Sequence, residues 1–208
     1  MSDLIIIGAG GFGRETLDVV EAINRQNPLW NFLGFIDDSQ PNAELLDARN
    51  ATWLGDRTEL RNFQNAWYVV GISNPEIRRT LVSLAQSAGL SPATLIHPSV
   101  HLGSQTNVGE GSIICAGSSL TTNISIGLHS QLNPGVRIGH DTVLGDFVSI
   151  YPGSVIGGNV SIGEEVTVGA NVTILQGIII GKATVVGAGS VVTKDIAQNS
   201  VVKGIPAR

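Results

Sequence analysis

Aliphatic residues recur at a fixed interval of six in the second half of the chain. From Ile96 to Val192, all seventeen positions on this step are Ile, Leu or Val, and the next residue is glycine in ten cases. The fifth residue of each hexad is always Ser, Thr, Val or Ile. A period of six matches neither a helix nor a simple hairpin. It predicts a triangular β-solenoid, in which each hexad forms one short face and points its aliphatic residue inward.

The length of the repeat sets the size of the predicted solenoid. Three hexads make one coil, so seventeen hexads give nearly six coils. At a strand spacing of ~4.8 Å the prism is roughly 27 Å tall. The period has no break between Ile96 and Val192. We therefore expect no long loop to leave the prism there.

Residues 1–90 follow a different pattern, in which short apolar runs alternate with helical spacing. The runs at residues 4–7, 32–36 and 67–71 predict strands, and residues 14–24 and 75–88 predict helices. The second helix begins with Pro75 and is followed by Gly89, as helix termini favour. Strands separated by helices predict a parallel sheet of the α/β class.

Charge and glycine are divided as unevenly as the hydrophobic pattern. Residues 1–90 hold 18 charged side chains and residues 91–208 only 11, whereas the second part holds 18 of the 26 glycines. The shift falls in a turn-like cluster around residues 89–92. We therefore expect two domains, 1–90 and 91–208.

Several functional classes are disfavoured by composition. No window of ~20 apolar residues predicts a membrane span, and no basic leader precedes the first apolar run, so we expect a cytoplasmic protein. The single Cys115 excludes an internal disulfide framework and a multi-cysteine zinc site. A net charge of −5 argues against a nucleic-acid partner.

A glycine-rich turn follows the first predicted strand. Gly8, Gly10 and Gly13 form G-x-G-x-x-G, which lets backbone N–H groups and a helix N-terminus approach a phosphate. One interpretation is a dinucleotide cofactor, with Asp37 or Asp38 holding ribose hydroxyls. About 90 residues provide only half of a dinucleotide fold, which favours a nucleotide-sugar diphosphate. A purely structural turn is the third possibility.

The four histidines differ in their surroundings. His97 lies in the first hexad, where packing under the domain junction is expected, and His101 and His129 fall on outward or corner positions and are expected to be solvated. His140 follows Gly139 and precedes Asp141. An imidazole can accept a proton near neutral pH, and a neighbouring carboxylate favours the imidazolium.

Motifs along nearly the whole chain resemble a known family. The hexads look like the left-handed parallel β-helix of hexapeptide acyltransferases. The chain is similar to nucleotide-sugar acetyltransferases of bacterial surface-glycan pathways, including UDP-4-amino-sugar N-acetyltransferases of the bacillosamine pathway and the sialic-acid O-acetyltransferase type. The segments that carry this resemblance are residues 7–15, 34–38, 96–99, 139–141, 145–147 and 204–208.

This resemblance implies a fold, an activity and a set of site residues. It implies a Rossmann-like α/β half domain with a parallel sheet, followed by a left-handed parallel β-helix. The implied enzyme transfers acetyl from acetyl-CoA to the amino group of a UDP-, dTDP- or GDP-linked amino-deoxy sugar. His140 would be the general base, supported by Asp141, and Asn133 would lie close to the acceptor or to His140. The implied nucleotide-sugar contacts are Gly10, Gly11, Phe12, Asp37, Asp38, Gly71 and Asn74.

The later coils are expected to bind acetyl-CoA. Gly169, Ala170 and Ala188 are small corner residues along which a pantetheine arm could lie. Ser149 falls where relatives place a residue that touches the coenzyme. Lys194 belongs to a C-terminal group of basic residues suited to its phosphates, together with Lys182, Lys203 and Arg208. A prism with long flat faces and few charges predicts a homotrimer with active sites between subunits.

Three alternatives stay open at this point. A sugar or sialic-acid O-acetyltransferase would need the same base and the same thioester. A zinc lyase would need three converging histidines, and His97, His101 and His129 do not stack at multiples of one coil, so we expect no metal. A β-helix without catalytic function would use none of these residues.

Overall fold

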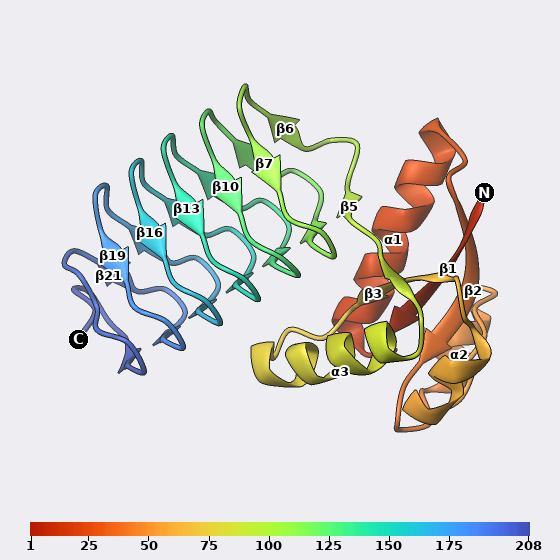
Figure 1. The fold of residues 1–208 in the computed structure, drawn as a ribbon. Helices are drawn as coiled ribbons and strands as arrows, with labels where there is room; N and C mark the ends of the chain where they lie inside the picture. The colour runs from red at the N-terminus through yellow and green to blue at the C-terminus, as the bar shows by residue number, and fades with distance from the viewer. The chain divides into compact units, whose positions relative to one another are not determined.

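A computed structural model describes all 208 residues, which form two compact units, 1–95 and 96–208 (Figure 1). The boundary predicted from the sequence lies after residue 90. It moves by five residues because β4 (Ser91–Pro92) still pairs with β3 (Trp67–Val70) of the first unit. The solenoid begins with β5 (Leu95–Ile96).

The first unit is a four-stranded parallel sheet in the order β2-β1-β3-β4. β1 (Ser2–Ile7) lies in its interior beside β2 (Trp30–Ile36), and α1 (Gly11–Gln26) and α3 (Pro75–Ser87) match the predicted helices. The α/β class is therefore confirmed. Helix α2 (Ala43–Asp47) and the 3₁₀ helix η1 (Arg57–Asn62) escaped prediction because they are too short to show a hydrophobic period. No helix is long and apolar enough to cross a membrane.

The second unit consists of three parallel sheets that share its coils, as Figure 1 shows. We call them the seven-, six- and five-stranded faces. The seven-stranded face contains β5, β8 (Ile113–Ile114), β11 (Gln131–Leu132), β14 (Ser149–Ile150), β17 (Thr167–Val168), β20 (Val185–Val186) and β22 (Val201–Val202). The six-stranded face contains β6 (His101–Leu102), β9 (Ser119–Leu120), β12 (Arg137–Ile138), β15 (Val155–Ile156), β18 (Thr173–Ile174) and β21 (Val191–Val192). The five-stranded face contains β7 (Asn107–Val108), β10 (Ser125–Ile126), β13 (Val143–Leu144), β16 (Ser161–Ile162) and β19 (Ile179–Ile180).

Strand pairing confirms the coil length inferred from the hexads. Leu132 pairs with Ile150, and Ile138 pairs with Ile156, in each case eighteen residues further along the chain. The prediction of a β-solenoid is therefore confirmed, and its geometry is consistent with the left-handed β-helix. The last coil is two residues shorter, because Val185 pairs with Val201.

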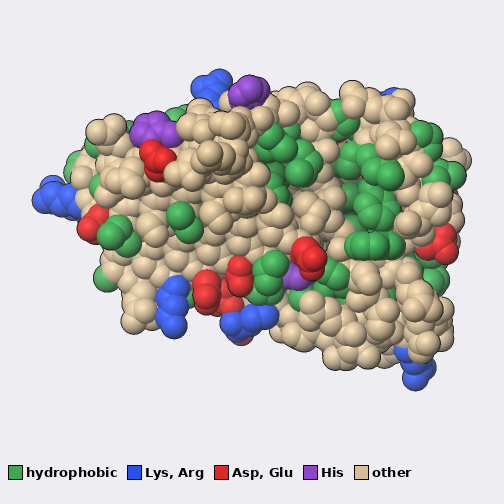
Figure 2. All heavy atoms as spheres, turned by 45° about the horizontal axis from the view of Figure 1, so that its top comes forward, with side chains coloured by type: hydrophobic (Ala, Val, Ile, Leu, Met, Phe, Trp, Pro, Cys, Tyr) green, Lys and Arg blue, Asp and Glu red, His purple; other side chains and the backbone are tan.

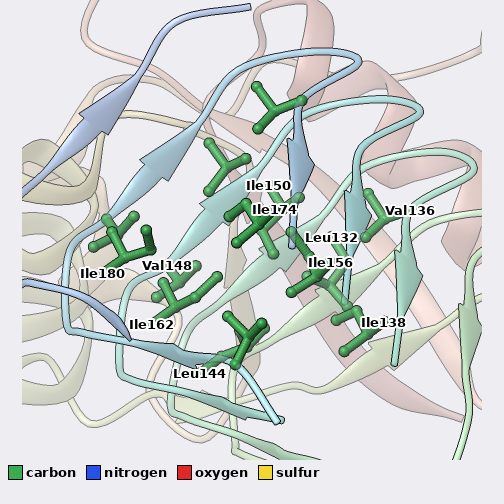
Figure 3. Close-up of a cluster of buried hydrophobic side chains, with 14 of the residues drawn as sticks. Leu132, Val136, Ile138, Leu144, Val148, Ile150, Ile156, Ile162, Ile174 and Ile180 are labelled. Atoms are coloured by element: carbon green, nitrogen blue, oxygen red, sulfur yellow. The ribbon is translucent and has the colours of Figure 1, made fainter. Parts of the chain in front are cut away.

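The aliphatic ladder fills the inside of the prism (Figure 3). Leu132, Ile150 and Val168 are fully buried, whereas Leu102 on the first coil is 41% exposed because no complete coil lies before it. The small fifth residues also point inward. Most of the hydroxyls among them donate to a backbone carbonyl: Ser154 Oγ lies 2.7 Å from the Gly169 oxygen, although the buried Thr106 hydroxyl has no partner. This hydrogen bond removes the cost of burying a polar group.

Stacked coils place residues eighteen apart in columns along three edges. Two of these edges matter for the site. The His140 edge, between the six- and five-stranded faces, carries Thr122, His140, Gly158, Gln176 and Lys194. The Gly169 edge, between the seven- and six-stranded faces, carries Asn133, Tyr151, Gly169 and Gly187. The residues that follow them in the chain form a second column on the same edge, which includes Ala170 and Ala188.

One prediction about the histidines is wrong. His129 was expected to be solvated, but it is only 4% exposed, and its ring stacks on Phe147 with centroids 5.4 Å apart. Its corner position turns the side chain onto the next coil rather than into solvent. His101 is exposed as expected, and His97 is half-buried with its Nδ1 accepting from the Ser99 backbone N–H.

Candidate functional site

His140 and Asp141 form a hydrogen-bonded pair on the His140 edge. His140 Nδ1 lies 2.7 Å from Asp141 Oδ2. The His140 side chain is 60% exposed and the Asp141 side chain 50% exposed. The pair sits in the turn after β12, where Asp141 adopts a left-handed backbone (φ 58°). That turn brings two adjacent side chains side by side. The association predicted from the sequence therefore exists as a contact.

Asp141 is also held from the preceding coil. Asn123, eighteen residues earlier, donates from Nδ2 to Asp141 Oδ1 over 2.7 Å. This amide and the His140 ring lower the pKa of the Asp141 carboxyl below its usual value. The carboxylate is thus ionised at neutral pH and can only accept hydrogen bonds. The Nδ1 of a neutral His140 must therefore carry the proton, which leaves the Nε2 lone pair free to act as a base.

Gly158 provides the floor beneath the imidazole. A Cβ atom added to Gly158 would lie 2.5 Å from His140 Nε2, and the three nearest atoms to it all belong to that ring. The ring therefore rests on the backbone of the next coil. The sequence shows Gly157-Gly158 only as a double glycine, so this supporting role was missed. The feature of the sequence that could have revealed this role is that Gly158 follows His140 by eighteen residues, which is one coil.

Lys194 lies on the same edge as His140, three coils further along. Gln176 occupies the column between Gly158 and Lys194, and both Gln176 and Lys194 are exposed. At ~4.8 Å per coil, the Lys194 backbone is roughly 14 Å from that of His140. This column therefore carries an exposed imidazole and, three coils further along, an exposed ammonium group.

The remaining predicted residues of the second unit lie elsewhere. Gly169, Ala170 and Ala188 meet on the Gly169 edge, where a Cβ on Gly169 would touch the Ala188 nitrogen at 2.6 Å. Asn133 is on the same edge two coils earlier; it is 4% exposed, and its Nδ2 has no hydrogen-bond partner. Ser149 on β14 is fully buried. Its expected contact with acetyl-CoA stays a prediction.

In the first unit, the glycines of the turn after β1 serve two different purposes. A Cβ on Gly13 would lie 1.9 Å from the Gly8 oxygen, and one on Gly71 would lie 2.6 Å from the Gly13 Cα, so these glycines permit close backbone packing. Gly10 and Gly11 have no atom within 4 Å of an added Cβ. They leave the N-terminus of α1 open to an anion, because its first N–H groups have no intrahelical partners.

Asp37 and Asp38 end β2 with different partners. The two carboxylate oxygens of Asp37 accept from the backbone N–H groups of Ala9 (2.8 Å) and Ser39 (2.9 Å). Asp38 accepts from the Arg57 backbone N–H and, through Oδ2, from the Arg57 guanidinium. The side-chain hydrogen bond from Arg57 lowers the pKa of the Asp38 carboxyl. Arg57 was not anticipated because nineteen residues separate it from Asp38.

The loop after β3 contains two of the predicted nucleotide-sugar contacts, Gly71 and Asn74, and hydrogen bonds within the protein hold it in place. Asn74 Oδ1 accepts from the Ile77 backbone N–H and caps α3. The buried Arg78 donates from Nη1 to the Ile72 and Ser73 carbonyls. Phe12 is half-buried in the first turn of α1. Gly71 is buried and its backbone N–H donates to the Ile7 carbonyl, so it acts through packing, whereas Asn74 acts through capping.

Charged chemistry is sparse on the molecular surface. On the face in Figure 2, charged side chains and histidines lie at a few points separated by wide uncharged areas. No group of three or more His, Cys, Asp or Glu side chains is arranged to hold a metal ion. The exposed His140 and Asp141 pair is therefore distinctive in the second unit.

Two family models match the chain. Residues 3–84 match the PglD N-terminal domain, and residues 159–194 match the hexapeptide repeat of succinyl-transferase. GDP-perosamine N-acetyltransferase of Escherichia coli is 30% identical over 125 residues, which are 59% of this chain and 55% of that relative. The alignment thus spans little more than half of the curated relative's length.

Solved structures match the whole chain. PerB from Caulobacter crescentus, in complex with CoA and GDP-perosamine, is 27% identical with a TM-score of 0.89, over 100% of this chain and 97% of that one. The acetyltransferase domain of PglB from Neisseria gonorrhoeae, in complex with acetyl coenzyme A, is 25% identical with a TM-score of 0.88, over 100% and 98%. The family resemblance expected from the sequence is therefore confirmed: the chain matches the models of the PglD N-terminal domain and of a hexapeptide repeat. It is similar along its whole length to a perosamine N-acetyltransferase solved with CoA and to the acetyltransferase domain of PglB solved with acetyl coenzyme A.

Proposed function

We propose that this protein transfers the acetyl group of acetyl-CoA to the amino group of a nucleotide-linked amino-deoxy sugar used for surface glycans, with His140 as general base. The observation that carries the proposal is the 2.7 Å contact between His140 Nδ1 and an ionised Asp141. The likeness to solved perosamine N-acetyltransferases supports the acyl donor and the acceptor class. Two of those relatives are variants in which one histidine is replaced.

The tautomer of His140 determines the path of the proton during the reaction. Asp141 holds the Nδ1 proton, so Nε2 accepts the proton that the sugar amine loses as its nitrogen attacks the thioester carbonyl carbon. Backbone N–H groups stabilise the oxyanion that forms. When the carbon–sulfur bond breaks, the imidazolium returns its proton to the departing thiolate of coenzyme A. Asp141 stays ionised throughout and stabilises the transient imidazolium.

Acetyl-CoA supplies the reactive thioester, and two edges of the β-helix suit its chemistry. Gly169 and Ala170 are half-buried and Ala188 is exposed, so their small side chains leave room for a pantetheine arm along this edge. The exposed Lys194, on the same column as His140, would face a phosphate. Ser149, which is buried in the single chain, is the remaining predicted contact of the coenzyme.

The first unit would hold the nucleotide part of the acceptor. Gly10, Gly11 and Phe12 open the N-terminus of α1 to the diphosphate, while Asp37 and Asp38 lie at the end of β2 where ribose hydroxyls bind in related sheets. The loop of Gly71 and Asn74 forms the opposite wall. Asn133 is the predicted contact of the sugar, and its buried Nδ2 has no hydrogen-bond partner within the chain.

A homotrimer would join the two functional edges. His140 and Gly169 stand on different edges of one prism, with the six-stranded face between them. In a closed ring of three chains, the Gly169 edge of one subunit can face the His140 edge of the next. Each active site would then combine a base from one subunit with coenzyme contacts from its neighbour.

Replacing His140 tests the base. His140→Ala is expected to lower kcat/KM by about 10²- to 10⁴-fold, because the amine loses its proton acceptor. Thiol release from acetyl-CoA would be followed with GDP-, UDP- and dTDP-linked 4-amino sugars and with free sialic acid. His101→Ala, an exposed histidine on β6, is the matched control. Full activity of His140→Ala would exclude His140 as the general base. Thiol release with sialic acid alone would identify an O-acetyltransferase.

Replacing Asp141 by its amide tests the tautomer. Asp141→Asn is expected to reduce kcat by roughly 10²-fold or more, because the amide can donate to Nδ1 and move the proton to Nε2. The lowered pKa of Asp141 means that its contribution is present at neutral pH and is lost only as pH falls through that lowered value. Between pH 5 and 8 the Asp141 carboxyl should therefore stay ionised and add no pH dependence of its own to the wild-type rate. An unchanged kcat for Asp141→Asn at neutral pH would contradict this role.

Gly158→Ala tests the floor under the imidazole. The Gly158 backbone is outside the left-handed region, so alanine is tolerated there, but its methyl group would displace the His140 ring. We expect kcat/KM to fall about tenfold or more with little change in thermal unfolding. The double variant with His140→Ala is the control, because Gly158→Ala should cost nothing further once the ring is absent. An equal loss in both backgrounds would indicate a different cause.

Sedimentation equilibrium tests the assembly. We expect a species of three times the chain mass of 21.7 kDa at concentrations where acetyl transfer is measured. The physical reason is that the functional edges complete one another only between copies. An active monomer would overturn the shared active site.

A further inference from the structure

A hollow lies at the carboxyl ends of the strands in the first unit. Its walls come from the ends of β1 and β2, from η1 and from α3, and it contains ≈330 Å³ of empty space that opens to solvent. The lining residues are Ile7, Gly8, Ile36, Asp37, Asp38, Arg57, Ile72, Ile77 and Leu81. In open parallel sheets this is the end at which ligands bind.

The hollow has an apolar floor and a charged rim. Ile72, Ile77 and Leu81 supply apolar surface, and Ile77 remains 50% exposed although it lines the hollow. Such an isolated apolar surface fits the flat face of a nucleobase. Gly10 and Gly11 do not line the hollow. A nucleotide with its diphosphate at the start of α1 and its ribose near Asp37 would place its base here.

Arg57 is the cation on this rim, and Asp38 fixes its orientation. Asp38 Oδ2 accepts from Nε at 2.7 Å and forms an ion pair with Nη2, while Asp38 Oδ1 accepts from the Arg57 backbone N–H at 3.1 Å. Two guanidinium donors that converge on one carboxylate oxygen, together with the backbone bond to the other oxygen, hold the planar guanidinium in one orientation. Arg57 keeps the other three of its five N–H donors for a ligand, and it has no acceptor to offer.

We propose that Arg57, oriented by Asp38, selects the base of the bound nucleotide by donating to a ring carbonyl oxygen. Guanine carries such an oxygen at C6, and uracil and thymine carry one at C4. Adenine and cytosine present an amino donor at the corresponding atom. An amino group that faces Arg57 leaves donors on both sides unpaired, which is costly in a partly desolvated site. This inference rests on the proposed nucleotide-sugar site and names its base class: GDP, UDP or dTDP rather than ADP or CDP.

Titration calorimetry on the full chain tests the selection without the acetyl-transfer reaction. The probes are GDP, UDP, ADP and CDP, each titrated into wild type, Arg57→Gln and the control Arg61→Gln. Arg61 is an exposed arginine on the same 3₁₀ helix that does not line the hollow. We expect wild type and Arg61→Gln to bind GDP and UDP roughly tenfold or more tightly than ADP and CDP. In Arg57→Gln the preference should shrink to about threefold or less, because glutamine offers both a donor and an acceptor.

Asp38→Asn provides a second variant that keeps Arg57. It removes the charge that orients the guanidinium, so the base preference should weaken while thermal unfolding verifies the fold. Equal binding of all four nucleotides to wild type, a preference for ADP or CDP, or an unchanged preference in Arg57→Gln would overturn the proposal. Absence of any nucleotide binding would overturn both this inference and the nucleotide-sugar site. A normal base preference without acetyl transfer would leave the inference standing and contradict the proposed function alone.

Discussion

The stacking of coils at a constant eighteen-residue repeat is the constraint on which the second unit depends. Each inward aliphatic residue packs on the one in the next coil, as Leu132 does on Ile150, and backbone hydrogen bonds join the same two coils. A one-residue insertion would turn the interior residues outward. Because the register cannot slip, side chains far apart in the sequence occupy one edge. The contact between Asn123 and Asp141 is a direct product of this register.

The same constraint explains why chemistry is confined to the edges. Interior positions are occupied by aliphatic or small residues, and most of their hydroxyls donate to backbone carbonyls, as that of Ser154 does. Corners allow left-handed backbone and long polar side chains, so His140 and Asp141 can occupy a turn. The coil beneath must then leave room for the ring, which Gly158 does by having no side chain. The catalytic proposal therefore depends on a glycine as much as on a base.

The first unit uses close backbone packing for a related purpose. Gly8, Gly13 and Gly71 bring the start of α1 against the ends of β1 and β3, so the open turn at Gly10 and Gly11 is presented at the carboxyl edge of the sheet. Asp37 ties this turn to β2 through the Ala9 backbone N–H. The neighbouring Asp38 is thereby directed to Arg57 rather than to the turn. Two adjacent carboxylates thus acquire different tasks: one holds the backbone, and the other orients a cation.

Much of this protein could be predicted from the order of its residues. Hexads reveal their coil because the inward position recurs without interruption, and long helices such as α1 reveal themselves through their apolar spacing. His140 and Asp141 could be paired because they are adjacent. Short elements such as η1 gave no period, and the burial of His129 could not be foreseen because it depends on the ring of Phe147 one coil away.

The sequence by itself determined the repeat, the class of both units and the residues able to do chemistry, since these depend on local periodicity and side-chain type. Only the tertiary structure decided which of those residues meet. It placed Gly158 under His140 and Arg57 against Asp38, and it buried Ser149. The physical reason is that each of these outcomes depends on contacts between residues distant in the sequence, and such contacts exist only after the coils stack and the sheet forms.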